Sequence, residues 1–270
     1  MNNRSFVNAV KALAYLLAFF IISSLIAGVF FVVSLFGNTD TVPEITNVYD
    51  DNKIIDNLDI TLKTTSLEIM DSNEFRVDTN NPKIKINYQN GTLKIKENGA
   101  TLFNKDYLVL KIYLPSSYTF KTAKLEMGTG KTDIDYLNTN DLKLQLGAGK
   151  SILKKLEVNT NTTIESGIGL VEILDGTLNN LDLENGIGKT NIKASILGDS
   201  KIECGIGTIN LELIGSQESY KLNVEKGIGN VNIDDKIYSD TILGNGKNLI
   251  KIDGGIGNIN VKIKNQKNKY

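Results

Sequence analysis

The stretch Ile164-Glu165-Ser166-Gly167-Ile168-Gly169, with Ile173 four residues further on, decides how this chain folds. It consists of an aliphatic residue, an acidic residue, any residue, Gly-x-Gly, three residues and another aliphatic residue. Seven versions occur between Glu126 and Val261. Their first glycines are at 128, 147, 167, 186, 205, 227 and 255, so the steps are 19, 20, 19, 19, 22 and 28 residues. A nearly constant step predicts an array of stacked repeats.

Each repeat is predicted to consist of short strands. Ile, Leu, Val and Thr recur at every second position, and no stretch has a helical period long enough to compete. A unit of about 20 residues holds two or three strands, and one such layer cannot bury its apolar face alone. The sequence therefore predicts an all-β fold, a single-stranded parallel β-solenoid with about 20 residues per coil.

The glycines are expected to form the corners of the coils. Ile164 and Ile168 are four apart and share a strand face, whereas Ile168 and Ile173 are five apart, so the chain must turn between them. Glycine alone takes a positive φ at such a turn without cost. We expect a corner at Gly169 and an interior stack of one isoleucine per coil, formed by Ile168, Ile187, Ile206, Ile228 and Ile256. The predicted corner glycines are Gly128, Gly130, Gly147, Gly149, Gly167, Gly169, Gly186, Gly188, Gly205, Gly207, Gly227, Gly229, Gly255 and Gly257.

Composition excludes several kinds of site. The formal net charge of −1 provides no general attraction to nucleic acid. The chain has no histidine, and Cys204 is its only cysteine, which rules out an intrachain disulfide, a histidine base and zinc sites built from Cys and His. We expect Cys204 to be a small buried side chain rather than a reactive thiol.

The N-terminal region predicts a membrane anchor. The 25 residues from Ala12 to Phe36 carry no charge, and as a helix of about 37 Å they could cross a hydrocarbon core of about 30 Å. Arg4 and Lys11 precede this segment, so the positive-inside rule places the N terminus in the cytoplasm and the solenoid outside the cytoplasmic membrane. A cleaved signal peptide is the alternative.

The chain is thus divided into five parts. We predict a cytoplasmic tail (1–11), a transmembrane helix (12–36), a linker (37–56), a strand-rich lead-in or cap (57–120) and the Gly-x-Gly solenoid (121–270).

Asn90-Gly91 between alternating runs predicts a hairpin within the lead-in. The long sixth step predicts an inserted loop at about 234–247. The lysines at 262, 264, 267 and 269 are expected to protect the last strand against end-to-end addition.

Three features of this chain are shared with a known family. They are the strand-rich lead-in, the Tyr113-Leu114-Pro115 sequence near its end, and the repeated Gly-x-Gly coils. Over residues 57–263 the chain resembles the bacterial putative-adhesin domain of unknown function (DUF4097-like), a β-solenoid of Gram-positive envelope proteins. The resemblance implies a transmembrane helix, a link to adhesion or to cell-envelope stress systems, and no established enzymatic chemistry.

Some motifs suggest ligands but lack essential parts. Gly130-Lys131-Thr132, Gly149-Lys150-Ser151 and Gly188-Lys189-Thr190 look like ends of phosphate-binding loops, but the required earlier glycine is missing and no helix follows. Calcium-binding β-rolls need Asp where Asn191, Asn210, Asn232 and Asn260 stand. We therefore predict no nucleotide, cofactor or metal site of these kinds.

One acidic position recurs in the repeat. Glu126, Glu165, Glu184, Glu203, Glu225 and Asp253 occupy it, with Gln145 as the exception, and stacking should align them about 4.8 Å apart on the surface. The candidate binding ladder is Glu165, Glu184, Glu203 and Glu225, which could hold a divalent ion or a cationic polymer. A solvated acidic face is the alternative.

The repeated acids also raise the possibility of a polysaccharide-acting β-helix enzyme. A catalytic pair should interrupt the repeat, whereas these acids follow it, so no catalytic residue is assigned. The sequence favours a noncatalytic adhesion or scaffold module of the cell envelope, whose partners are the membrane and a cell-wall polymer or envelope protein. A regulatory or sensing module of an envelope-stress membrane complex is the alternative.

Overall fold

The structure is a computed structural model that describes residues 44–49, 53–100 and 108–265. The predicted tail and transmembrane helix lie outside these residues, as do parts of the linker. Within the described ranges no helix has the length and apolar character needed to span a membrane. Apart from one 3-10 turn, η2 (Gln217–Ser219), the regular elements there are strands, which confirms the all-β prediction.

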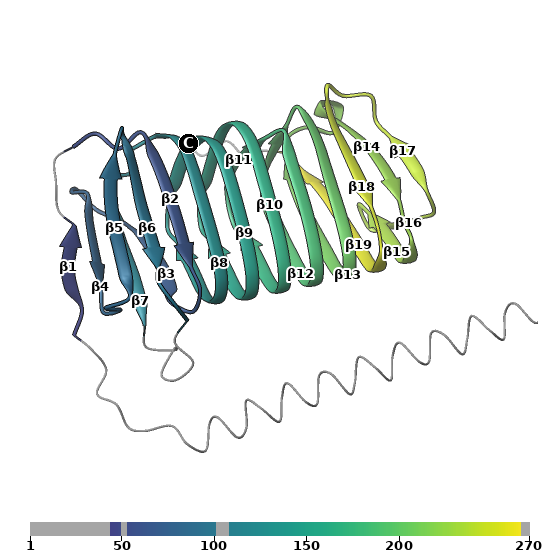
Figure 1. Cartoon of the computed structure of the whole chain (residues 1–270). Helices are drawn as coiled ribbons and strands as arrows, with labels where there is room; N and C mark the ends of the chain where they lie inside the picture. The colour runs from purple at the N-terminus through teal and green to yellow at the C-terminus, as the bar shows by residue number, and fades with distance from the viewer. Residues whose placement is uncertain (1–43, 50–52, 101–107, 266–270) are drawn as a thin grey trace, which may run out of the picture. The chain divides into compact units, whose positions relative to one another are not determined.

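A single sheet of 19 strands joins these elements (Figure 1). The strands are β1 Thr46–Tyr49, β2 Asn57–Leu62, β3 Ser66–Asp71, β4 Arg76–Thr79, β5 Ile84–Gln89, β6 Thr92–Glu97, β7 Val109–Leu114, β8 Phe120–Ile134, β9 Leu137–Leu153, β10 Leu156–Ile173, β11 Gly176–Asn179, β12 Leu181–Leu197, β13 Asp199–Ile214, β14 Tyr220–Glu225, β15 Ile228–Ile233, β16 Lys236–Tyr238, β17 Thr241–Leu243, β18 Asn248–Asp253 and β19 Ile256–Lys264.

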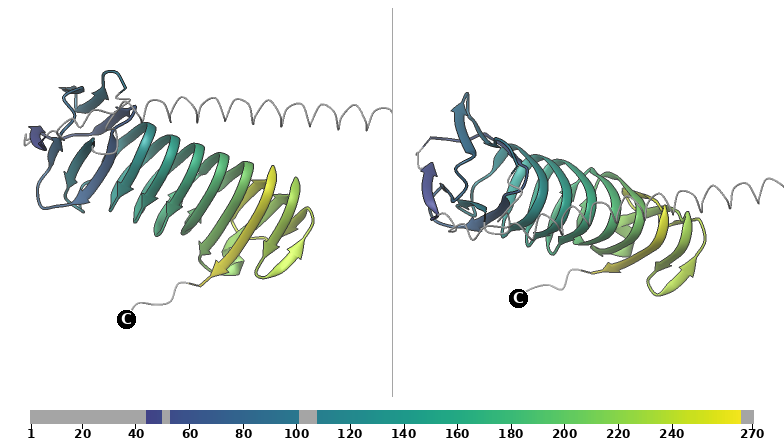
Figure 2. Two further views of the ribbon diagram at one scale, coloured as in Figure 1. Left: turned by 90° about the horizontal axis from the view of Figure 1, so that it is seen from below. Right: turned by 60° about the horizontal axis from the view of Figure 1, so that its bottom comes forward.

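The repeats form coils that lie side by side along one axis (Figure 2). β8, β9, β10, β12 and β13 pair in parallel and in register, so that Ile164 lies opposite Leu183 and Gly169 opposite Gly188. One coil runs from Thr162 to Asn179: the middle part of β10 leads to the Gly-x-Gly corner, the last part of β10 leaves it, and β11 forms a third arm, which pairs with the first part of β10. Each arm turns every second side chain into a shared aliphatic core.

The expected interior stack of isoleucines is wrong. Ile164 is fully buried, but the isoleucines between the paired glycines are 39% to 71% exposed. The turn at Gly169 does exist, with φ of +144°, but the register of paired residues is already interrupted at Gly167. A Cβ on Gly167 would lie 2.4 Å from the carbonyl oxygen of Gly147 in the adjacent coil, and one on Gly169 would lie 1.9 Å from that of Gly149. The corner therefore takes up three residues, and Ile168 projects from its outer side.

The N-terminal end combines a coil with a cap. β2 and β3 pair in parallel with β8 and so form a first coil, although Lys63-Thr64-Thr65 replaces Gly-x-Gly at its corner. Beyond it, β5 and β6 form the hairpin predicted at Asn90-Gly91, where both residues have positive φ. β1, β4 and β7 complete this end through antiparallel pairs.

A buried carboxylate closes this first corner. Glu97 has no exposed surface, and its Oε2 accepts hydrogen bonds from the backbone N–H groups of Lys63 (2.6 Å), Thr64 (2.9 Å) and Thr65 (3.2 Å). Its Oε1 accepts from the Thr64 hydroxyl and from the Asn81 amide. Glu97 thus provides the acceptors that a further coil would otherwise supply.

At the C-terminal end the coils do not follow chain order. β18 and β19 lie between β13 on one side and β14 and β15 on the other (Figure 1). The predicted insertion at 234–247 is the return connection, in which β16 pairs antiparallel with β15 and β17 with β14. This places β16 and β17 beside the outermost arms of the stack.

The expected protection of a terminal strand by lysines is therefore wrong for β19, which has a neighbour on both sides. Lys262 pairs with Asp235 at 3.0 Å and Lys264 with Glu212 at 2.8 Å, so these lysines join the last strand to neighbouring elements. Lys267 and Lys269 lie outside the described residues.

Candidate functional site

Four parallel rows of residues run along the stack at the Gly-x-Gly corner. We name them in the order in which the chain crosses them, and give the members of each in stack order. The acidic row is Glu126, Gln145, Glu165, Glu184, Glu203, Asp253 and Glu225. The glycine floor is Gly128, Gly147, Gly167, Gly186 and Gly205. The corner ridge is Thr129, Ala148, Ile168, Ile187, Ile206, Ile256 and Ile228. The lysine row is Lys131, Lys150, Leu170, Lys189, Thr208, Asn258 and Asn230.

A groove of about 800 Å³ lies over the glycine floor. The acidic row from Glu126 to Glu203 lines it, as do the residues between acid and glycine, from Met127 to Cys204. The groove exists because five consecutive coils have no side chain at the floor position. The same glycines that allow the coils to approach each other therefore also open the surface.

The acidic row is partly neutralised within the chain. Glu165 accepts a 2.6 Å hydrogen bond from the Gln145 amide and pairs with Lys143 at 3.1 Å. These contacts lower the pKa of Glu165. A hydrogen bond from Lys124 is the main cause that lowers the pKa of Glu126, and Lys201 pairs with Glu203. Lys143 belongs to the coil before that of Glu165, so spacing within one repeat does not reveal this pair.

The predicted ladder of Glu165, Glu184, Glu203 and Glu225 is not contiguous. Asp253 lies between Glu203 and Glu225, because β18 is inserted between β13 and β14. Glu184 forms no ion pair with another described residue. The described part of the chain contains no group of three or more Cys, Asp or Glu side chains placed to hold a metal ion.

The corner ridge and the lysine row are the features that sequence reasoning missed. Lys131, Lys150 and Lys189 lie within continuous strands directly after the second glycine of their corners. Their equal offset from the repeat is visible in the sequence, but the incomplete phosphate-loop motifs to which they belong do not reveal a surface row. The exposed isoleucines were missed because strand parity was carried through a corner that breaks it.

The second arm carries a ladder of hydrogen-bonded amides. Asn191 donates to Glu172 at 3.0 Å, Asn210 to Asn191 at 2.7 Å, Asn260 to Asn210 at 2.8 Å and Asn232 to Asn260 at 2.9 Å. These are the positions at which calcium-binding rolls need Asp. Each amide here joins one coil to the next instead.

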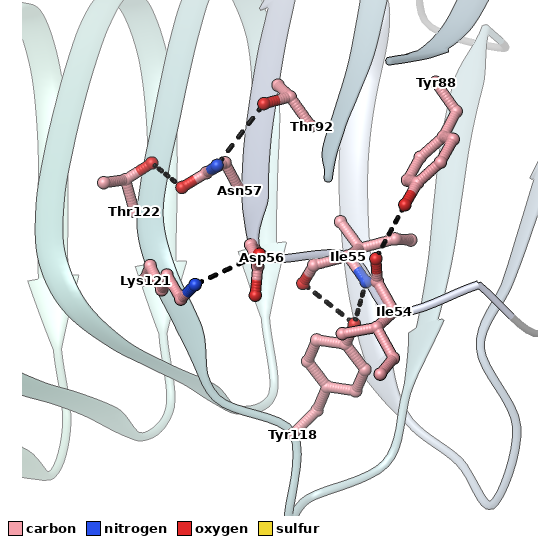
Figure 3. A network of polar contacts seen from close by, with 9 residues as sticks. All are labelled: Ile54, Ile55, Asp56, Asn57, Tyr88, Thr92, Tyr118, Lys121 and Thr122. Carbon is pink, nitrogen blue, oxygen red and sulfur yellow. Dashed lines mark hydrogen bonds and ion pairs between the residues drawn. The ribbon is translucent and has the colours of Figure 1, made fainter. Parts of the chain in front are cut away.

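The tyrosines of the lead-in hold the cap together (Figure 3). The Tyr118 hydroxyl accepts from the Ile55 N–H at 2.7 Å and donates to the Ile55 carbonyl at 2.9 Å, while Tyr88 donates to the carbonyl of Ile54. Burial is the main cause that raises the pKa of Tyr118. Asp56 pairs with Lys121 at 3.1 Å in the same network. These contacts tie the chain entering β2 to the strands around it.

Cys204 occupies the inner side of the groove. It is 8% exposed and takes the position held by Ser166 and Asn185 in the two preceding coils. The prediction that it is a small buried side chain is confirmed.

Comparison with known proteins identifies the family. Residues 55–242 match the family described as Toastrack DUF4097. A solved structure described as a putative cell adhesion protein from Clostridium sporogenes is 20% identical, with a TM-score of 0.35, over 82% of this chain and 98% of that one. Another, described as a putative adhesin from Bacteroides fragilis, is 13% identical, with a TM-score of 0.44, over 81% and 97%. No curated protein matches the chain. Because the family model covers more than half of its residues, the chain belongs to the Toastrack DUF4097 family.

Proposed function

We propose that this protein is a noncatalytic adhesion or scaffold module of the bacterial cell envelope. The observation that carries the proposal is the groove of about 800 Å³, which presents a carboxylate or an amide beside a glycine in each of five successive coils. A surface of this kind suits an extended partner, because each coil adds one weak contact and the contacts act together. A cell-wall polymer and an envelope protein are the two kinds of partner that we propose.

The distribution of the acids supports a binding role over a catalytic one. Glu126, Glu165 and Glu203 each have a lysine partner and recur with the structural repeat. A catalytic acid and base would need two different environments that separate their pKa values. Three of the four carboxylates that line the groove instead share one environment, because each is paired with a lysine.

We also propose that the Ala12–Phe36 segment anchors the module in the cytoplasmic membrane, with the N terminus in the cytoplasm and the solenoid outside. The length of this uncharged segment and the preceding Arg4 and Lys11 support this orientation. Protease treatment of intact cells tests it, since cleavage should remove the solenoid and leave the N-terminal tail protected. Loss of the tail without disruption of the membrane would contradict the orientation.

Binding is tested with the full-length chain in lipid nanodiscs, using purified cell-wall polymer in a pelleting assay. We expect the wild type to bind and the Ile187→Asp variant, which changes the corner ridge, to bind at least about tenfold more weakly. The matched control is Ile237→Asp, because Ile237 is exposed but lies on β16, away from the corner. No binding by the wild type, together with recovery of a membrane protein that requires Ala12–Phe36, would favour the regulatory alternative.

A further inference from the structure

We propose that the partner of the Gly-x-Gly corner is a second copy of this chain, paired in parallel about a two-fold axis that runs along the stack. The inference rests on the proposed function in so far as both use the corner as a binding surface. It goes further by naming the occupant and its orientation.

The apolar part of this surface needs a partner. Ile168, Ile187, Ile206, Ile256 and Ile228 are consecutive in the stack, and each leaves at least 39% of its surface in contact with solvent. Single exposed isoleucines are common on soluble proteins, but a continuous row over five coils marks an interaction surface.

The corner carries a depression and a projection side by side, and each matches the other on a second copy. The glycine floor is a depression, and the corner ridge, one residue further along the chain, projects from the surface. A two-fold axis between the two rows would place the ridge of each copy over the floor of the other. Ile168, Ile187 and Ile206 of one copy would then lie over Gly167, Gly186 and Gly205 of the second copy, with Thr129 and Ala148 over the two preceding floor glycines.

The charges select the parallel arrangement. The acidic row lies beyond the floor and the lysine row lies beyond the ridge. A two-fold axis along the stack exchanges the two sides of the corner, so the acidic row of each copy faces the lysine row of the other. Glu126 then faces Lys131 and Glu184 faces Lys189, while the remaining acids face the neutral members of that row, Leu170, Thr208, Asn258 and Asn230. An antiparallel pair, with its axis across the stack, would instead bring acidic row against acidic row and ridge against ridge.

One pair of residues fits this arrangement in particular. Glu184 and Lys189 belong to the same coil, on opposite sides of the corner, and neither forms an ion pair with another described residue of its own chain. In the parallel pair, Glu184 of each copy faces Lys189 of the other. An extended basic peptide would also match the acidic row, but it would leave Lys189 and the apolar ridge without a partner.

The first experiment identifies which residues of one copy lie next to which residues of the other. Two full-length chains, one with nitrogen-14 and one with nitrogen-15, are co-refolded into nanodiscs and treated with a carbodiimide, which joins amines to carboxylates at close range. We expect Glu184–Lys189 cross-links that contain one peptide of each isotope. Mixed cross-links confined to other surfaces, or cross-links that never combine the two isotopes, would overturn the proposal.

The second experiment reverses the charges. Sedimentation of the full-length chain should show dimers that are roughly tenfold weaker in Glu184→Lys and in Lys189→Glu, because each change places like charges against each other twice in the symmetric pair. The double variant Glu184→Lys/Lys189→Glu should recover wild-type dimerisation. Absence of this recovery, with all three variants folded by circular dichroism, would rule out the parallel pair.

The third measurement separates this inference from the proposed function. Ile187→Asp should abolish dimers, whereas the control Ile237→Asp should not. A wild-type chain that stays monomeric but binds cell-wall polymer would overturn the inference and leave the proposed function intact. A monomeric chain that binds polylysine along the groove would show that the occupant is a basic polymer instead.

Discussion

The side-chain amide of Asn260 donates a 2.8 Å hydrogen bond to the side-chain oxygen of Asn210, although 50 positions separate the two residues in the chain. Asn232 lies nearer to Asn210 in sequence, but it is the neighbour of Asn260 on its other side. The amide ladder therefore records the order of the coils in space, in which β19 lies between β13 and β15.

This ladder predicts a loss of stability when its central member is removed. Asn210→Ala deletes the hydrogen bond accepted from Asn260 and the one donated to Asn191, so we expect a loss of about 1–3 kcal/mol in the free energy of unfolding. Urea unfolding followed by circular dichroism measures it. Asn258→Ala, at an exposed position of the adjacent strand β19, is the control and should change stability by less than about 0.5 kcal/mol. Equal effects of the two changes would contradict a stabilising role of the ladder.

The close approach of the coils predicts that a corner glycine cannot be replaced. A Cβ at Gly188 would lie 2.0 Å from the carbonyl oxygen of Gly169, and the residue has φ of +140°. We expect Gly188→Ala to cost about 3 kcal/mol or more in unfolding free energy, because overlap adds to backbone strain. Gly99→Ala is the matched control, since its φ is +88° but no atom lies within 4 Å of the added carbon. It should cost only about 1 kcal/mol. A similar cost at both glycines would show that backbone strain alone matters.

The outward position of the corner isoleucines predicts a contrast between two residues of one coil. Ile164→Ser places a hydroxyl in the core and leaves a cavity, so it should cost about 4 kcal/mol in unfolding free energy. Ile168→Ser should cost less than about 0.5 kcal/mol, because the side chain is already 59% exposed. The two thermal unfolding midpoints, measured at a concentration at which the chain is monomeric, test this contrast. Similar losses at the two positions would mean that Ile168 is buried after all.

The cap carboxylate predicts a pH-dependent stability. Burial raises the pKa of Glu97, but hydrogen bonds from Thr64, Lys63 and Thr65 lower it by more, so the net pKa is below the ordinary value. A group whose pKa is lower in the folded state stabilises the fold above the unfolded pKa of about 4.3, and this contribution is lost as the pH falls through the folded value. Glu97→Gln should therefore cost about 2 kcal/mol at pH 7 and progressively less in acid.

The measurement for Glu97 is a set of urea unfolding curves between pH 7 and pH 3. Glu157→Gln is the control, because Glu157 forms a surface ion pair with Lys155 at 3.6 Å, and such pairs contribute little to stability. A difference between wild type and Glu97→Gln that stays constant over this range would contradict the assigned role of the carboxylate.

The sequence by itself determined the repeat, the strand content and the corners. Paired glycines such as Gly167 and Gly169 disfavour a helix, and alternation around residues such as Ile164 indicated which side of each arm is buried. These features are local, because they depend on φ preferences and on a period of two along a strand. The Asn90-Gly91 hairpin was predictable for the same reason.

The tertiary structure alone decided the outward direction of Ile168, the pairing of Lys143 with Glu165 and the position of β19 between β13 and β15. The contact between coils determines how many residues a corner takes up, since a Cβ at either glycine would meet the backbone of the adjacent coil. The order of the last coils depends on a long-range pairing that no local spacing encodes. The candidate site depends on both the local sequence and the tertiary structure. The glycines leave the floor without side chains, and the stacking of the coils aligns the rows beside it.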